Sequence, residues 1–194
     1  MWMFPGKILL CHSIIKDPVF QPASERTRRL TDICSLGPPP GIMCDMQKET
    51  ESTTRVITVD PLYPQPDIIE PAATIIREGS LVAFPTETVY GLGADALNAD
   101  AVRRIFAAKG RPAHDPVIAH VSGPEMVADL VASMPTVAQT LIETFWPGAL
   151  TLVLPKSEQV PSAVTANGPT VAVRCPAHPV AQALIAAAGT PIAA

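Results

Sequence analysis

Short apolar runs alternate with amphipathic helical segments over residues 55–194, and this alternation constrains the fold more than any other feature of the chain. The run Leu81-Val82-Ala83-Phe84 has the length and apolar character of a buried strand. It leads into a turn rich in hydroxyl groups and glycine, and a helical pattern follows. Strands interleaved with helices are typical of a sheet covered by helices. We therefore predict a single α/β domain over residues 55–194.

Apolar periodicity and breakers give the predicted elements of this domain. Strands are expected over residues 55–59, 81–84, 117–121, 150–154, 171–174 and 192–194. Helices are expected over residues 68–77, 99–109, 123–133, 136–145 and 179–188. Asn98 or Asp100 can cap the second helix, and Gly110 lies just past its end, as is common at helix termini.

The two ends of the chain look different from this domain. Residues 1–54 have no sustained period, and the stretch 37–41 (GPPPG) breaks any regular element. We expect an irregular, mobile extension there, or a true start at Met46; acidic residues argue against a transit peptide. The chain also stops at Ala194 inside a predicted strand, so we expect the domain to be incomplete at its C-terminus.

Composition excludes several classes of protein. Apolar residues make up 47% and charged residues 16% of the chain, which favours a compact fold. A net charge of −4 argues against a general nucleic-acid coat, although it allows a local basic site. No apolar run approaches the roughly 20 residues that span a bilayer. The cysteines lack C-x-x-C spacing and suggest neither a zinc site nor a disulfide framework, as in reduced cytoplasmic proteins. These are Cys11, Cys34, Cys44 and Cys175.

The turn after the strand at 81–84 is the first candidate site. Its sequence TETVYGLG supplies the hydroxyl groups of Thr86, Thr88 and Tyr90. Gly91 and Gly93 would let backbone amides approach a ligand closely. An ordinary strand-to-loop junction stabilised by threonine turns would have the same composition.

Lys109 and Arg111 form a basic pair on either side of the glycine that ends the second helix. Cations in a last turn stabilise the helix dipole, so capping is one interpretation. The other is phosphate binding, since arginine holds phosphate oxygens through a planar fork and lysine acts as a mobile charge. The family resemblance described below favours the phosphate role.

Two further residues lie on predicted strands. His120 interrupts the apolar segment 117–121, where a lone histidine is more often a hydrogen-bonded core residue than a ligand. Arg174 ends the strand 171–174, and a buried arginine must find an anion because unpaired burial is costly. Its partner is either an acidic side chain or, through a bidentate contact, the carboxylate of a substrate.

Six segments in order resemble the YrdC-like threonylcarbamoyl-adenylate synthase family over residues 68–194. They are FPTETVYGLG, the Lys-x-Arg of KGRP, PVIAHV, FWPGALTLVL, VAVRCP and GTPIAA. The resemblance implies an open, twisted, mixed sheet flanked by helices. It also implies synthesis of threonylcarbamoyl-adenylate from L-threonine, bicarbonate and ATP with release of pyrophosphate. Downstream threonylcarbamoyl transferase proteins would use this product to modify adenosine 37 of tRNA.

The same resemblance assigns roles to individual residues. Thr88, His120 and Arg174 would hold threonine. The ATP site would be lined by Lys109, Arg111, Asp115 and Thr170, of which Lys109 and Arg111 would act in catalysis by stabilising phosphate charge. Such a reaction needs positioning and cationic stabilisation more than a protein nucleophile. Mg²⁺ would accompany the triphosphate, but the sequence shows no dedicated carboxylate cage for it.

Two departures from the family pattern and two alternatives remain. Asp115 stands where the family commonly has asparagine, and the family's Ser-x-Asn motif would come after Ala194. A non-catalytic module of the same fold that binds double-stranded RNA or tRNA is the main alternative. The carbamoyl-transfer domain of hydrogenase maturation also shares the fold, but it occurs in larger chains with zinc-finger-like cysteines.

Overall fold

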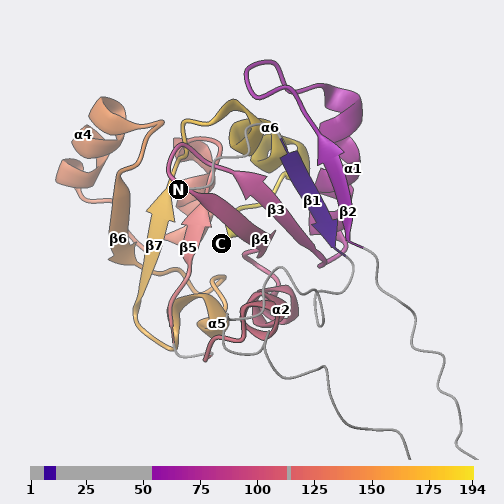
Figure 1. Ribbon diagram of the computed structural model, residues 1–194. Helices are drawn as coiled ribbons and strands as arrows, with labels where there is room; N and C mark the ends of the chain where they lie inside the picture. The colour runs from indigo at the N-terminus through magenta and orange to yellow at the C-terminus, as the bar shows by residue number, and fades with distance from the viewer. Residues whose placement is uncertain (1–6, 12–53, 113–114) are drawn as a thin grey trace, which may run out of the picture.

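A computed structural model describes residues 7–11, 54–112 and 115–194 of the protein. These residues form one eight-stranded sheet in the strand order β2-β1-β3-β4-β8-β5-β7-β6. Helices pack against this sheet (Figure 1). The strands β5 and β7 pair in parallel, whereas all other neighbours pair antiparallel. The predicted α/β class with a mixed sheet is therefore confirmed.

The strands are short. They are β1 (Lys7–Cys11), β2 (Arg55–Thr58), β3 (Leu81–Pro85), β4 (Tyr90–Asp95), β5 (Ile118–His120), β6 (Thr151–Pro155), β7 (Thr170–Arg174) and β8 (Ile192–Ala193). The helices are α1 (Pro66–Arg77), α2 (Ala99–Lys109), the 3₁₀ turn η3 (Pro124–Met126), α3 (Val127–Leu130), α4 (Thr136–Phe145), α5 (Ser162–Thr165) and α6 (Pro179–Ala188).

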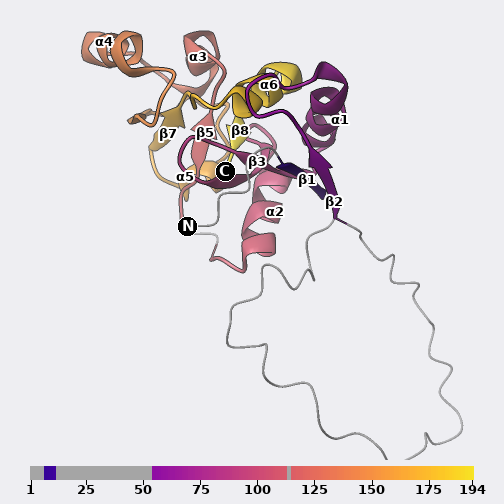
Figure 2. The same ribbon diagram turned by 45° about the horizontal axis from the view of Figure 1, so that its top comes forward.

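Side chains that alternate along the strands divide the buried residues into two clusters. In one cluster, Val82, Phe84 and Ile192 pack against α1 and α6. In the other, Ala83 and Leu92 pack against α2. Figure 2 shows α1 and α6 on one side of the sheet and α2 on the other. Because residues i and i+2 face the same side of a strand, the period-2 pattern of β3 supplies both cores.

The helix boundaries predicted from capping hold well. The prediction for 99–109 coincides with α2, where the Asn98 side chain accepts hydrogen bonds from the amides of Asp100 and Ala101. Gly110 ends this helix in the left-handed conformation, with φ of 61°, which glycine adopts without steric cost. The helix predicted over 123–133 is wrong in length, because η3 and α3 end where Val131 pairs with Lys156 in an isolated bridge.

The segment predicted as a turn after β3 is partly a strand. Tyr90–Asp95 forms β4, which pairs antiparallel with β3, so only residues 86–89 turn. The glycines of β4 are needed for their lack of a side chain rather than for turn geometry. A Cβ on Gly93 would lie 2.6 Å from side-chain atoms of Phe84 and of Ile192, so only glycine allows this close approach.

The irregular extension predicted for residues 1–54 is wrong at Lys7–Cys11. This segment forms β1, an internal strand between β2 and β3, and Ile8 on it is fully buried. Its pairing partners lie more than forty residues later in the sequence, so no local period reveals the strand. Residues 1–6 and 12–53 of the predicted extension, including Cys34, Cys44 and Met46, lie outside the described residues.

None of the helices in the described part of the chain is both long enough and apolar enough to cross a bilayer.

Replacing Ile8 with alanine tests whether β1 belongs to the folded domain. We expect Ile8→Ala to lower the free energy of unfolding by about 2–4 kcal/mol, because it leaves a cavity under α1. Val56→Ala on the neighbouring strand is the control; Val56 is 55% exposed, and we expect a change within about 0.5 kcal/mol. Urea unfolding measures both, and equal small changes would contradict the place of β1 in the core.

Candidate functional site

Arg174 and His120 stand side by side at the ends of two parallel strands. Arg174 is the last residue of β7, His120 is the last residue of β5, and the two are partners in the strand register. The carboxyl ends of parallel strands are where α/β proteins place ligands. Both side chains leave the same face of the sheet, because registered neighbours in a parallel pair point the same way.

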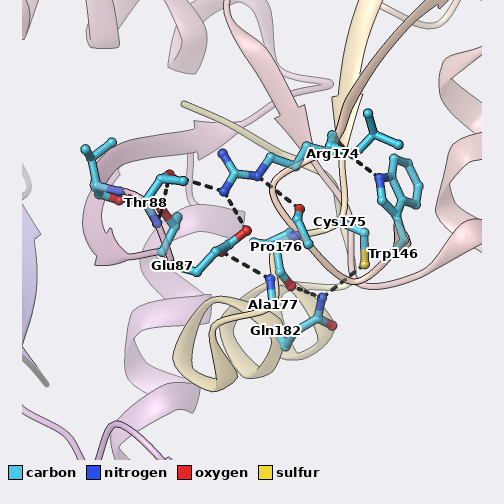
Figure 3. A network of polar contacts seen from close by, with 12 residues as sticks. Glu87, Thr88, Trp146, Arg174, Cys175, Pro176, Ala177 and Gln182 are labelled. Carbon is cyan, nitrogen blue, oxygen red and sulfur yellow. Dashed lines mark hydrogen bonds and ion pairs between the residues drawn. The ribbon is translucent and has the colours of Figure 1, made fainter. Parts of the chain in front are cut away.

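The buried guanidinium of Arg174 is held by two segments, the turn 86–89 and the loop at Gly148, and Figure 3 shows its contacts with the turn. Its Nη2 donates to Glu87 Oε1 at 2.5 Å and to Thr88 Oγ1 at 3.2 Å. Its Nε donates to the carbonyl oxygen of Gly148 at 3.3 Å. Arg174 is only 7% exposed, so the expectation that it must find an anion is confirmed. In this structure the anion is Glu87.

Sequence reasoning missed Glu87, although it lies within the TETVYGLG motif. Its other oxygen, Oε2, accepts the backbone N–H of Ala177 at 3.1 Å. Burial raises the pKa of Glu87, but the hydrogen bond and charge of Arg174, with the Ala177 amide, outweigh it and hold the pKa below its usual value. One sequence feature could have identified Glu87 as a site residue: it is an acid between two threonines in a turn that follows a buried strand.

The turn 86–89 is held locally by Thr86. The Oγ1 of Thr86 donates to the carbonyl oxygen of Val89 at 2.5 Å and accepts the amide of Val89 at 3.2 Å. This threonine turn fixes the backbone, so the Glu87 and Thr88 side chains reach Arg174 (Figure 3). The structure thus brings Thr88 to Arg174, the residue with which the family resemblance groups it.

Two loops complete the surroundings of Arg174. The indole of Trp146 donates to the carbonyl oxygen of Leu150 at 2.8 Å, which fixes the loop containing Gly148. The Gly148 amide then donates to the carbonyl oxygen of Cys175 at 2.8 Å. Gln182 on α6 donates to the carbonyl oxygen of Pro176 at 2.6 Å, as Figure 3 shows. Arg174 is therefore surrounded by segments that are themselves held by hydrogen bonds.

His120 is buried and neutral. Burial, with a smaller contribution from the charge of Arg174, lowers the pKa of His120 from 6.5 to about 4. Its Nδ1 lies 3.3 Å from the carbonyl oxygen of Ile192, and its ring meets the ring of Phe84 edge-on with centroids 6.0 Å apart. A carbonyl oxygen only accepts, so Nδ1 carries the proton and Nε2 presents a lone pair.

The basic pair lies at the C-terminal end of α2. Gly110 turns the chain there, and the Arg111 amide bonds back to the carbonyl oxygen of Phe106 at 3.1 Å, as in a Schellman motif. Burial, followed by the charge of Arg111, lowers the pKa of Lys109. A half-buried ammonium beside a second cation is unsatisfied electrostatically, which favours an anion at this place.

Asp115 and Thr170 lie at the opposite end of the parallel pair from Arg174. Thr170 begins β7, and Asp115 comes three residues before β5 starts at Ile118. At about 3.3 Å per residue, Thr170 and Arg174 are roughly 13 Å apart along the strand. Thr170 and Asp115 are exposed, and Asp115 makes an interaction of its own. The seven predicted residues therefore lie in three places: Thr88, His120 and Arg174 together, Lys109 and Arg111 at the end of α2, and Asp115 and Thr170 at the start of β5 and β7.

The described residues hold no group of three or more His, Cys, Asp or Glu side chains able to bind a metal ion. Of the histidines outside β5, His178 accepts the amide of Val180 at 3.2 Å and caps α6, whereas His12 and His114 lie outside the described residues. The donor set in the described part thus offers no cage for a resident metal.

Comparison with known proteins decides the family. The family model Sua5/YciO/YrdC, described as "Telomere recombination", matches residues 74–194 of this chain. The chain belongs to the Sua5/YciO/YrdC family. That range contains β3 to β8 and all of the predicted site residues, so the family resemblance seen in the sequence is confirmed.

Members of the Sua5/YciO/YrdC family that resemble the chain include two named threonylcarbamoyl-AMP synthase. The protein from Pyrococcus abyssi is 58% identical over 123 residues, covering 63% of this chain and 36% of that protein. The protein from Bacillus subtilis is 51% identical over 143 residues, covering 73% of this chain and 40% of that protein. The chain therefore spans well under half the length of these two relatives.

Solved structures of the Sua5/YciO/YrdC family share the fold. The crystal structure of Pyrococcus abyssi Sua5 complexed with L-threonine has a TM-score of 0.67 and 55% identity, covering 68% of this chain and 38% of that one. Escherichia coli YciO has a TM-score of 0.63 and 27% identity, covering 70% of this chain and 66% of that one.

Replacing His120 with glutamine tests its neutral, buried state. The pKa of His120 is lower in the folded protein than in the unfolded chain, so the unfolded chain binds the proton first as pH falls from 6.5 towards 4. We expect the stability of the wild type to fall over this window by roughly 2 kcal/mol more than that of His120→Gln. Urea unfolding at pH 7 and pH 4.5 measures the difference, and equal losses would show that His120 is not buried in neutral form.

Proposed function

We propose that this chain makes threonylcarbamoyl-adenylate from L-threonine, bicarbonate and ATP, and releases pyrophosphate. The observation that carries the proposal is the cluster of Thr88, His120 and Arg174 at the carboxyl ends of β5 and β7. A structure of the same fold with 55% identity is titled as a complex with L-threonine. A fixed cation, a hydroxyl group and a neutral imidazole are suited to a hydroxylated amino acid.

In the threonine half of the site, each group has one role. Arg174 attracts the carboxylate of threonine, and Nε2 of His120 accepts a hydrogen bond from a polar group of the same substrate. Thr88 is exposed and contacts Arg174, so its hydroxyl can turn to the ligand. These contacts orient threonine so that its amine is available for reaction.

In the ATP half, the protein supplies charge rather than a nucleophile. The threonine amine adds to the carbon of bicarbonate-derived CO₂ and loses a proton, which gives a carbamate. A carbamate oxygen then attacks the α-phosphorus of ATP, and the bond to the β-phosphate oxygen breaks to release pyrophosphate. Lys109 and Arg111 would stabilise the negative charge on the phosphates. Thr170 would supply a hydroxyl donor. Lys109, Arg111 and Thr170 would thus line the ATP subsite.

Asp115 bears on the metal requirement. A carboxylate near phosphates is repulsive unless a cation lies between them. Since the described residues offer no metal cage, Mg²⁺ would arrive bound to ATP, and Asp115 would face that ion or Lys109. Mg²⁺ would then neutralise part of the triphosphate charge.

The proposed product defines the setting of the reaction. Threonylcarbamoyl-adenylate would pass to threonylcarbamoyl transferase proteins that modify adenosine 37 of tRNA in the cytoplasm. We also place the proposed domain at residues 55–194, with the strand β1 added to its sheet.

Pyrophosphate release from ATP and bicarbonate, with and without L-threonine, tests the proposal directly. Threonine-dependent release by the full chain supports the synthase. ATP-independent, salt-sensitive binding of double-stranded RNA or tRNA without any release would favour the non-catalytic module instead. Alanine and serine serve as amino acids that lack part of the threonine side chain.

Replacing the basic pair tests the ATP subsite. We expect Lys109→Ala and Arg111→Ala each to raise the KM for ATP at least about tenfold, because a charge-assisted contact to phosphate is lost. Arg103→Ala is the matched control: Arg103 is an exposed arginine of α2 that pairs with Asp100. The melting temperature should stay nearly constant in all three variants. An unchanged KM for ATP, or a loss of stability in place of a change in KM, would contradict the assignment.

A further inference from the structure

The guanidinium of Arg174 has one nitrogen left for a ligand. Both hydrogens of Nη2 are directed at Glu87 and Thr88, and the hydrogen of Nε is directed at Gly148. Nη1 has no hydrogen-bond partner among the described residues, and it is not among the fully enclosed polar atoms that lack one. Bidentate capture of a substrate carboxylate, as the sequence suggested, would therefore require an existing contact to break. A carboxylate can reach Nη1 without that change.

Glu87 is fixed at both of its oxygens. Oε1 accepts from Arg174 at 2.5 Å, and Oε2 accepts from the Ala177 amide at 3.1 Å just before α6. Its side chain is nevertheless 25% exposed, whereas that of Arg174 is 9% exposed. A carboxylate anchored at two points is a permanent part of the site rather than a stand-in that a substrate displaces. It keeps a face open to solvent beside the cation.

The fixed pair presents no net charge, and this limits which ligands it attracts. A plain carboxylate at Nη1 gains from Arg174 but is repelled by Glu87, which lies a few ångströms away. A zwitterion carries an ammonium next to its carboxylate, so the same Glu87 charge then attracts it. In a partly buried site such interactions act at reduced dielectric and are strong enough to decide between ligands.

We propose that Glu87 is a specificity-determining residue that makes the Arg174 site select zwitterionic α-amino acids over plain carboxylates. In this arrangement Nη1 of Arg174 receives the ligand carboxylate, and Glu87 faces the ligand ammonium. The inference rests on the proposed function, because it takes the Arg174 cluster to be the threonine subsite. It adds Glu87 to the residues of that site and states which charge pattern the ligand must have.

The test compares two ligands that differ in one charged group. L-Threonine and 3-hydroxybutyrate share the carboxylate and the hydroxyl group, but 3-hydroxybutyrate lacks the amine. Isothermal titration calorimetry on the full chain gives both dissociation constants for wild type and for Glu87→Gln. We expect the wild type to prefer threonine. In Glu87→Gln the preference for threonine should fall at least about tenfold, chiefly because 3-hydroxybutyrate binds more tightly.

Two further variants separate charge from structure. Glu70→Gln breaks another arginine–glutamate pair, the 2.6 Å contact with Arg77 on α1, and should leave the preference unchanged. Glu87→Asp keeps the negative charge and should keep the preference for threonine even where both affinities weaken. Thermal unfolding of each variant shows whether it is folded. If Glu87→Gln does not fold, the ligand preference of Glu87→Asp decides whether the charge of Glu87 sets the specificity.

The outcomes distinguish this inference from the proposed function. Threonine binding by the wild type with an unchanged preference in Glu87→Gln overturns the inference alone. Tighter binding of both ligands by Glu87→Gln in equal measure would show that Glu87 is a displaceable competitor, and it also overturns the inference alone. Loss of the preference for threonine over 3-hydroxybutyrate in Glu87→Asp also overturns the inference alone. A wild type that binds no threonine overturns the proposed function and this inference together.

Discussion

A buried cation needs a fixed anion, and the site depends on the way Arg174 meets that need. Its guanidinium is almost fully removed from water, so the negative charge of Glu87 is what makes its place on β7 tolerable. The hydrogen bonds that hold this pair also join the turn 86–89, the loop at Gly148 and the start of α6. Removing one partner would leave an uncompensated charge, so these three segments keep their places together. The geometry of the proposed threonine half follows from one ion pair.

The sheet determines how the two halves of the site relate. β5 and β7 are the parallel pair, so residues that end them gather at one edge and residues that begin them gather at the other. Arg174 and Thr170 lie on the same strand and the same face, roughly 13 Å apart. A ligand system that engages both must extend along the strand, as an amino acid joined to a nucleotide would. The arrangement thus suits a reaction that joins two substrates end to end.

The elements that could be predicted from the sequence are those set by local signals. The elements that could not be predicted depend on pairing between distant segments. The bounds of α2 follow from an Asn98 cap and a Gly110 stop, both of which act within a few residues. The strand β1 could not be found in this way, because its partners lie far along the chain. The sequence of β4 favours a turn because of its glycines, whereas in the fold these glycines allow close packing against Phe84. The anion requirement of Arg174 was evident, but Glu87 was not, since the fold alone brings the two together.

Charge is distributed unevenly over the site, and the distribution matches the proposed substrates. Around the carboxyl ends of β5 and β7, Arg174 is balanced by Glu87, and the low pKa of His120 keeps that imidazole neutral. At the C-terminal end of α2, Lys109 and Arg111 are two neighbouring positive charges. A neutral half suits a zwitterion, and a positive half suits a triphosphate with its metal ion. A charged His120 imidazole would add an uncompensated cation there, so burial that keeps it neutral preserves the balance on which the proposed discrimination against plain anions depends.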